Sequence, residues 1–120
     1  MNKLEFMEEN KIAIFVEIDL LNNIMDIKRR YEEELENYGM FYQHIIYNIL
    51  DNKELNTYEE HLEGQLLPEI WSQGQTRCIY CKPNNNKIIC LFYDFRGESK
   101  DNYFYAKELD NKIQVMYNEI

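Results

Sequence analysis

The sequence predicts a single α+β domain in which an N-terminal strand and two helices precede an antiparallel β-meander and a C-terminal helix. Apolar residues recur at helical spacing over residues 31–52 and again from residue 103 onward. After Gly64, short apolar runs alternate with turn residues, as in an antiparallel sheet. A chain of 120 residues is long enough for one hydrophobic core and too short for two. We therefore expect residues 1–120 to form one domain.

Two assignments near the N-terminus rest on short patterns. Leu4 and Phe6 alternate within Lys3 to Met7, which indicates a short first strand. The segment Lys11 to Ile27 fits two patterns, because its apolar residues alternate like a strand as far as Asp19 and also follow helical spacing. We favour a helix because the helical series continues past Asp19, where the alternation stops.

The segment Tyr31 to Asn52 has the clearest helical pattern of the first half. Phe41, Ile45 and Ile49 lie one turn apart and would share one face of a helix. Gly39 is a candidate break, because glycine interrupts helices. We expect helical structure on both sides of it.

The second half holds three apolar runs that are typical of strands: Leu66–Trp71, Thr76–Lys82 and Lys87–Phe95. A turn at Pro83 to Asn86 joins the last two runs and predicts a hairpin from Thr76 to Phe95. Within it, Ile88 to Tyr93 is apolar on both alternating faces, as expected of a central strand covered on both sides. We place this hairpin in the middle of the sheet, with the helices of the first half packed on one face.

The C-terminal segment is expected to begin as a loop and to end as a helix. Residues 97–102 are polar, which indicates a loop. From Tyr103 onward, Leu109, Ile113 and Met116 follow at i, i+4 and i+7, which predicts a final helix.

Composition favours a cytoplasmic protein with no membrane association. Residues 1–10 carry carboxylates and lack the apolar segment of a signal peptide. The longest uncharged stretch, residues 37–50, is shorter than the ~20 apolar residues that span a bilayer. The cysteine count is odd, at three, which indicates reduced thiols and not a disulfide framework.

The net charge of −9 is concentrated in the first half of the chain. Residues 1–60 hold 14 acidic and 6 basic groups, whereas residues 61–120 hold 8 acidic and 7 basic groups. A nucleic-acid-binding surface needs cations that replace the counterions of phosphate. Any such site must therefore lie in the second half. We expect the acidic run to be the solvated face of a helix: Glu32, Glu33, Glu34 and Glu36.

The pattern Cys78-Ile-Tyr-Cys81 resembles half of a zinc site. On a strand, residues at i and i+3 point to opposite faces, and no tight turn brings these two thiols together. Cys90 and His61 are the only other soft ligands nearby. We therefore expect cysteines of the core, with no bound metal and no cofactor.

Taken together, the second half resembles a family of bacterial toxins. The motifs follow one another at short spacings: His61-Leu-Glu-Gly64, Leu67-Pro-Glu-Ile70, Thr76-Arg-Cys-Ile-Tyr80, Lys87-Ile-Ile-Cys-Leu-Phe92 and Phe95-Arg96. Their order resembles the RelE/HigB superfamily, in particular its HigB or phage Gp49-like branch. The resemblance covers nearly the whole chain and lies in hydrophobic pattern and order more than in rare residues.

The resemblance implies the toxin of a type II toxin–antitoxin system, a ribosome-dependent mRNA endoribonuclease. Its partners would be an antitoxin protein, the ribosome and mRNA. In metal-independent cleavage the ribose 2′-OH attacks the adjacent phosphate, so the site must move protons and stabilise phosphorane charge. By motif, Arg77, Arg96 and Tyr105 are the catalytic candidates, with the arginines on phosphate. Lys100 and Tyr103 are the candidates for substrate binding, through charge and base stacking.

The chain departs from the family in ways that weaken this site. Trp71 stands where many relatives carry a basic residue, and the loop after Phe95 offers few cations beside Glu98 and Asp101. A structural role is the alternative for the candidates, with Arg77 paired to a carboxylate and the two tyrosines packed on the last helix.

A second function from a different class is also consistent with the charge pattern. A small acidic protein can act as a phage-type inhibitor, such as an anti-CRISPR protein, whose carboxylates occupy a basic nucleic-acid-binding site on a host enzyme. On this hypothesis the toxin-like pattern belongs to a reused scaffold, because function lies in sites and not in folds.

Overall fold

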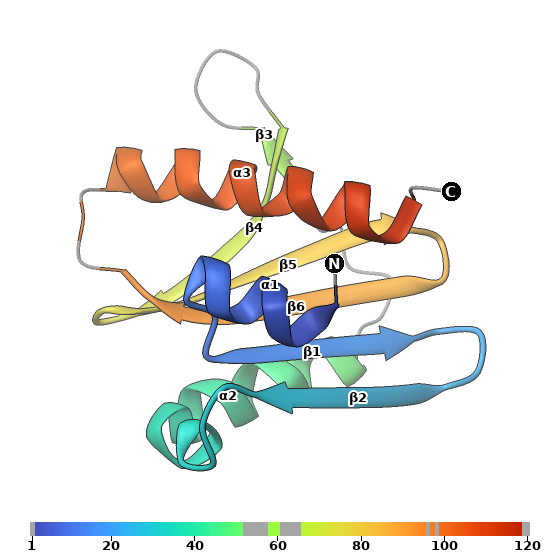
Figure 1. Ribbon diagram of the computed structural model, residues 1–120, viewed down its shortest axis with the longest axis horizontal. Helices are drawn as coiled ribbons and strands as arrows, with labels where there is room; N and C mark the ends of the chain where they lie inside the picture. Colours follow the sequence, from blue (N-terminus) through green and yellow to red (C-terminus); the bar gives the residue numbers. More distant parts are fainter. Residues whose placement is uncertain (1, 52–57, 61–65, 96, 98, 119–120) are drawn as a thin grey trace.

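A computed structural model describes residues 2–51, 58–60, 66–95, 97 and 99–118, with the backbone alone described at 58–60, 66–68, 99 and 100. The elements in chain order are α1 (Lys3–Asn10), β1 (Ile14–Asp19), β2 (Ile24–Arg29), α2 (Glu34–Asp51), β3 (Tyr58–Glu60), β4 (Leu66–Gln73), β5 (Thr76–Asn84), β6 (Lys87–Asp94) and α3 (Ser99–Asn118) (Figure 1). Within these residues no helix is both long and apolar enough to cross a membrane.

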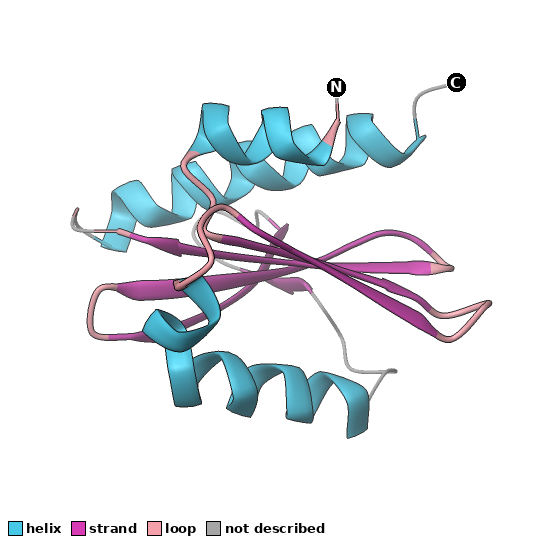
Figure 2. Cartoon of the chain, turned by 60° about the horizontal axis from the view of Figure 1, so that its bottom comes forward, coloured by secondary structure: helices cyan, strands magenta, loops and turns pink. Residues whose placement is uncertain are grey.

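The strands form one antiparallel six-stranded sheet in the order β2-β1-β6-β5-β4-β3. Helix α2 covers one face of the sheet, and α1 and α3 cover the other (Figure 2). The α+β class, the β-meander and the C-terminal helix are thereby confirmed. The packing of the first-half helices on one face is wrong, because α1 and α2 lie on opposite faces.

The predicted central hairpin is confirmed. Strands β5 and β6 pair from Thr76 opposite Asp94 to Asn84 opposite Lys87, and β1 flanks β6 on its other side. The register shifts between Cys81 and Asn84. Pro83 lies at this irregularity, where its missing N–H costs no ladder hydrogen bond.

Alternating residues of the central strands form two cores, one on each face of the sheet. In β6, Cys90 and Phe92 point to α2, whereas Ile89 and Leu91 point to α1 and α3. All four are fully buried. Each buried aliphatic side chain contributes ~1.5–3 kcal/mol, so these cores hold the three layers together.

The N-terminal segment is a helix and not the predicted strand. The side chain of Asn2 accepts a hydrogen bond from the backbone N–H of Glu5 at 2.8 Å and caps α1. Lys11 ends the helix in the left-handed conformation, with φ 55°. Capping therefore outweighs the short alternation of Leu4 and Phe6, because it satisfies N–H groups that a helix start leaves free.

The segment Lys11 to Ile27 is a β-hairpin and not the predicted helix. A carboxylate oxygen of Asp19 accepts hydrogen bonds from the backbone N–H groups of Leu21 and Asn22, both at 3.1 Å. Asn23 completes the turn with φ 56°. Asx-type bonding of this kind favours turns over helices. The alternation before Asp19 was therefore the informative pattern.

The remaining helices agree with the sequence except at their starts. Helix α2 begins at Glu34, and Gly39 breaks it with φ 46° and ψ −120°, as predicted. Its predicted end at Asn52 lies outside the described residues. Helix α3 begins at Ser99, so the predicted loop over residues 97–102 is too long.

Candidate functional site

Arg77 supports a turn of the sheet. Its Nη1 atom donates to the carbonyl oxygens of Gly74 at 2.6 Å and of Thr76 at 2.9 Å. Gly74 lies in the β4–β5 turn, with φ 59°, and Thr76 is the first residue of β5. One nitrogen of the guanidinium is therefore committed to the backbone. No ion pair of Arg77 with a carboxylate, the structural alternative for this residue, is found among the described residues.

Tyr105 joins two helices. Its hydroxyl donates to the carbonyl oxygen of Asn10 at the end of α1. Its ring packs on Tyr93 and Phe95, with centroids 5.2 and 5.9 Å apart. Burial raises the pKa of the Tyr105 hydroxyl, so the group keeps its proton at neutral pH. This is the structural role that was the alternative to proton transfer.

The other three candidates are Tyr103, Lys100 and Arg96. Tyr103 is half-buried on α3, two residues before Tyr105. Residues at i and i+2 do not share a helix face, so the two tyrosines point in different directions. Lys100 lies in the first turn of α3, where the backbone alone is described, and Arg96 lies outside the described residues.

The structure does bring Arg77 and Tyr105 to the same side of the sheet. Arg77 lies directly opposite Tyr93 in the β5–β6 ladder, and Tyr93 contacts Tyr105. The Tyr93 hydroxyl donates to Oδ1 of Asn102 at 2.8 Å. Burial, followed by the neighbouring Tyr105, raises the pKa of Tyr93. Arg77, Tyr93 and Tyr105 thus lie on one side of the sheet, and both phenols keep their protons and act as hydrogen-bond donors.

Trp71 also has a defined contact. Its Nε1 atom donates to Oε1 of Glu69 at 2.7 Å, and its ring lies 6.2 Å from that of Tyr80. An indole tied to a carboxylate replaces the basic residue of the toxin pattern. This part of β4 therefore adds negative charge and not a phosphate ligand.

The cysteines have the predicted orientations. Cys78 points to α2 and Cys81 points to α3, on opposite faces of β5. Burial raises the pKa of both thiols. Among the described residues, no group of three or more His, Cys, Asp or Glu side chains is placed to hold a metal ion.

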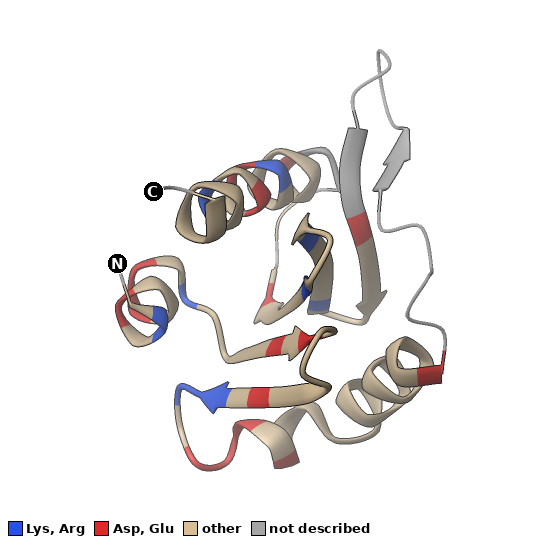
Figure 3. Cartoon of the chain, turned by 90° about the vertical axis from the view of Figure 1, so that its right-hand side faces the viewer, with Lys and Arg blue, Asp and Glu red and all other residues tan. Residues whose placement is uncertain are grey.

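The acidic run lies where the chain passes from β2 into α2 (Figure 3). Glu32 and Glu33 precede the helix, and Glu34 and Glu36 lie in its first turn. Three of the four are exposed, and Glu34 is half-buried. The positive end of the helix dipole favours carboxylates at this position. We call these four residues the carboxylate cluster.

Nearby arginines do not neutralise the carboxylate cluster. Arg29 donates to the backbone carbonyl of Glu32 at 3.4 Å, and Arg30 pairs with Glu8 at 3.3 Å. None of the ion pairs found among the described residues involves the cluster. Its charge is therefore available to a partner.

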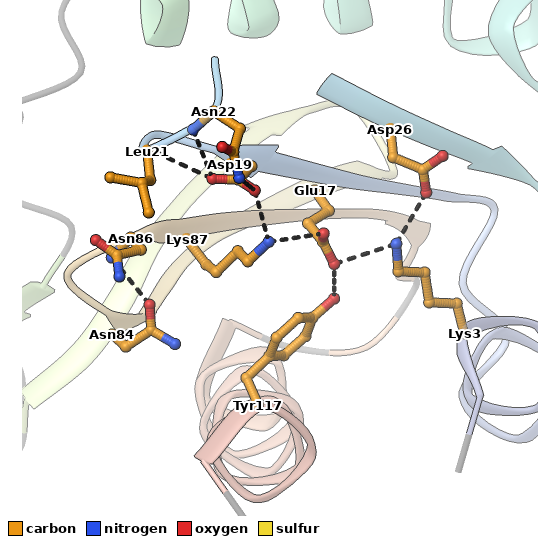
Figure 4. A network of polar contacts seen from close by, with 10 residues as sticks. All are labelled: Lys3, Glu17, Asp19, Leu21, Asn22, Asp26, Asn84, Asn86, Lys87 and Tyr117. Atoms are coloured by element: carbon orange, nitrogen blue, oxygen red, sulfur yellow. Dashed lines mark hydrogen bonds and ion pairs between the residues drawn. The ribbon is translucent and has the colours of Figure 1, made fainter. Parts of the chain in front are cut away.

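A second group of charges, which the sequence did not reveal, surrounds Glu17 in β1 (Figure 4). The Glu17 carboxylate is 16% exposed and lies 3.1 Å from Nζ of Lys3 and 3.3 Å from Nζ of Lys87. The Tyr117 hydroxyl donates to the same carboxylate. Four elements, α1, β1, β6 and α3, therefore meet at one side chain.

The two lysines each bind a further carboxylate. Lys3 lies 2.8 Å from Asp26 in β2, and Lys87 lies 3.2 Å from Asp19 at the end of β1. The ion pairs thus form a row in which anions and cations alternate, with its carboxylates on β1 and β2 and one of its lysines on β6 (Figure 4). A network of this kind holds charges in place better than an isolated surface pair.

The ionisation of this network argues against acid–base catalysis. Burial by itself would raise the pKa of Glu17, but hydrogen bonds from Tyr117 and Lys3 outweigh it and lower the pKa. Burial would lower the pKa of Lys3, and its bonds to Asp26 and Glu17 raise it instead. The carboxylates and lysines therefore stay charged at neutral pH and Tyr117 keeps its proton, whereas a general base needs a pKa near the working pH. The network is a structural clamp.

Two cavities lie beside these features. One, of about 480 Å³, borders the clamp and is lined by Asn2, Lys3, Leu4, Glu17, Lys28, Met116 and Tyr117. The other, of about 600 Å³, lies between α2 and β4 and is lined by Phe41, His44, Ile45, Asn48, Ile70, Trp71, Ser72 and Gln73. The lining of the first contains the Glu17 carboxylate, its partner Lys3 and also Lys28, and the lining of the second has no Lys or Arg. The second cavity therefore lacks the cations of a phosphate site.

A scan against protein-family models finds no matching family, and a search of curated proteins finds no matching relative.

Proposed function

We propose that this protein is a cytoplasmic, acidic binding protein that masks a basic nucleic-acid-binding site on a nucleic-acid-processing enzyme, in the manner of phage-encoded inhibitors such as anti-CRISPR proteins. The observation that supports this function is the carboxylate cluster, which is held at the start of α2 without ion-pair partners among the described residues. Carboxylates fixed on a helix present negative charge to a cationic groove as phosphates do.

The rest of the molecule favours binding over catalysis. Arg77 and Tyr105 are engaged with backbone carbonyls. In the clamp, the Glu17 carboxylate stays ionised and is held in place by its ion pair with Lys3. Contacts of this kind hold the fold in one arrangement, and a surface carried by a rigid fold loses little entropy on association.

Inhibition assays test this proposal. The protein is added to a panel of purified RNA-guided nucleases, restriction nucleases and other nucleic-acid-processing enzymes. The wild type should inhibit at least one of them. A variant with Glu32→Gln, Glu33→Gln, Glu34→Gln and Glu36→Gln should inhibit it at least tenfold more weakly, because four rim charges of about 0.5 kcal/mol each, together about 2 kcal/mol, are lost.

A charge-matched control separates the cluster from net charge. Glu5→Gln, Glu9→Gln, Asp101→Asn and Glu108→Gln remove the same number of exposed carboxylates from α1 and α3. This control should inhibit like the wild type. An equal loss of inhibition in the cluster variant and the control, or no inhibition of any enzyme by the wild type, would contradict the proposal.

An mRNA endoribonuclease toxin with an antitoxin partner is the second candidate. It is favoured by the meeting of Arg77 and Tyr105 around Tyr93, because two residues chosen by toxin-like order are brought to one face. On this function, induced expression halts growth and cuts translated mRNA at the ribosome. Arg77→Ala or Arg96→Ala should relieve both effects roughly a hundredfold, as expected for a lost transition-state contact of ~3 kcal/mol. Normal growth at high expression excludes it.

A further inference from the structure

Helix α2 carries no charged side chain along most of its length. No Asp, Glu, Lys or Arg lies between Glu36 and Asp51. Its inner side is apolar because it packs on the sheet, through Ile45, Ile46 and Ile49. Its outer side faces away from the sheet (Figure 2) and is uncharged as well.

The outer side presents large apolar groups to solvent. Met40, Gln43, Tyr47 and Leu50 follow at i, i+3, i+7 and i+10, and we call this stripe the α2 face. Met40 is 84% exposed, Tyr47 is 69% exposed and Leu50 is 41% exposed. A surface helix normally directs charged residues outward. The centre of a protein interface is instead depleted of charge and enriched in methionine and aromatic residues.

We propose that the α2 face docks on a partner protein whose surface presents an apolar patch bordered by lysine and arginine side chains. The sign of the partner's charge rests on the proposed function. The apolar contact rests on the composition and exposure of the stripe itself. The α2 face forms the dry centre of the contact, and the carboxylate cluster forms part of its rim.

Charge favours a basic protein over other occupants. The carboxylate cluster lies at one end of the α2 face, and Asp51 lies at the other. These anions repel nucleic acid and anionic lipid, and a second copy of a chain with net charge −9 brings like charges together. A cationic rim on the partner matches both ends of the stripe.

The helix is held firmly enough to serve as a docking element. Phe92 in β6 contacts the rings of Tyr38, Phe41 and Tyr42, with centroids between 5.3 and 6.0 Å apart. The Tyr38 hydroxyl donates to Asp94 at 2.8 Å. These contacts fix both sides of the Gly39 break, so the α2 face is preorganised.

Position-specific crosslinking tests the proposal in the cells that express the chain. The photoreactive residue benzoylphenylalanine is placed at Met40, at Tyr47 or, as a control, at Phe104, which is 58% exposed on α3. We expect one basic protein to crosslink at Met40 and Tyr47 and not at Phe104. No crosslink at either α2 position, or a crosslink to nucleic acid or to a second copy of this chain, would overturn the proposal.

Binding of the captured protein, once identified and purified, is then measured directly. Tyr47→Ser should weaken its affinity at least tenfold, and the matched Phe104→Ser should leave it unchanged. Circular dichroism confirms that both variants are folded. If the cluster variant loses binding and Tyr47→Ser does not, the α2 face is excluded while the proposed function stands. If Tyr47→Ser loses binding and the cluster variant does not, the proposed function fails and the α2 face stands with a neutral partner.

Discussion

The Tyr117 hydroxyl near the end of α3 donates a hydrogen bond to the Glu17 carboxylate of β1, across a separation of 100 residues in the chain. The same carboxylate binds Lys3 and Lys87. The C-terminal helix is therefore fastened to the first strand by a polar clamp as well as by its apolar face.

Removing the phenol oxygen should weaken this fastening. Tyr117→Phe keeps the ring and deletes one hydrogen bond to a charged group, which should lower the free energy of unfolding by about 1–2 kcal/mol. Urea denaturation measures the change. Tyr47→Phe, at an exposed position, is the matched control and should leave stability unaltered. Equal stability of Tyr117→Phe and the wild type would show that the clamp contributes nothing.

Stability should fall in acid, in part through Asp19. Hydrogen bonds from the side chain and backbone of Asn22, together with Lys87, lower the pKa of Asp19 to about 2. As the pH falls, the Asp19 carboxyl of the unfolded chain, with a pKa of about 4, takes up a proton before that of the folded chain does. The contribution of Asp19 to the free energy of unfolding is therefore complete above about pH 4 and is lost as the pH falls toward about 2.

Asp19→Asn should accordingly show a shallower loss of stability between about pH 4 and pH 2 than the wild type. Asp51→Asn, at the exposed end of α2, is the control and should retain the wild-type slope. Parallel curves for Asp19→Asn and the wild type would contradict the role of the Asp19–Asn22 turn.

The break in α2 should require glycine. Gly39 has φ 46° and ψ −120°, a conformation that is costly for any residue with a Cβ. Gly39→Ala should lower the free energy of unfolding by about 1–3 kcal/mol, although no atom would obstruct the new methyl group. Gln43→Ala, exposed on the same helix, should be neutral or slightly stabilising. An unchanged free energy of unfolding in Gly39→Ala would mean that the break is not needed for α2 to pack on the sheet.

The thiols should be inert in the folded protein. Cys78, Cys81 and Cys90 are free and fully buried, and burial raises the thiol pKa of the first two. A thiol-specific reagent should therefore label none of the three until urea unfolds the chain. Fast labelling of the native protein would show that the sheet opens locally.

Patterns that involve neighbouring strands and turns were predictable from the sequence. The β5–β6 hairpin follows from two apolar runs around a Pro-Asn-Asn-Asn turn. The Gly39 break follows from the conformational freedom of glycine. In each case the local pattern and the tertiary fold favour the same structure.

The N-terminal hairpin was predicted wrongly because its sequence supports two periods. Residues 11–27 match helical spacing, but the polar turn after Asp19 and pairing with β6 favour strands. Pairing with β6 joins residues 68 to 78 positions apart, such as Val16 and Cys90. A local periodicity does not contain that contact.

The clamp around Glu17 was missed for a related reason. Lys3, Lys87 and Tyr117 come from elements distributed over the whole chain. The alternation of Glu17 and Asp19 with apolar residues in β1 was the one available signal, and assigning a helix to this segment removed it. The carboxylate cluster, by contrast, lies within five consecutive residues, and three of its four members are solvent-exposed as predicted, although Glu34 is half-buried and Glu32 and Glu33 precede the helix.

The salt dependence of inhibition tests the central claim most directly. The inhibition constant for the most sensitive enzyme of the panel is measured at low and high salt for the wild type, the four-glutamine cluster variant and the charge-matched control. We predict that the cluster variant is at least tenfold weaker at about 0.1 M salt and that the gap narrows as salt screens the contact. Equal inhibition by the cluster variant and the control at every salt concentration would contradict the account.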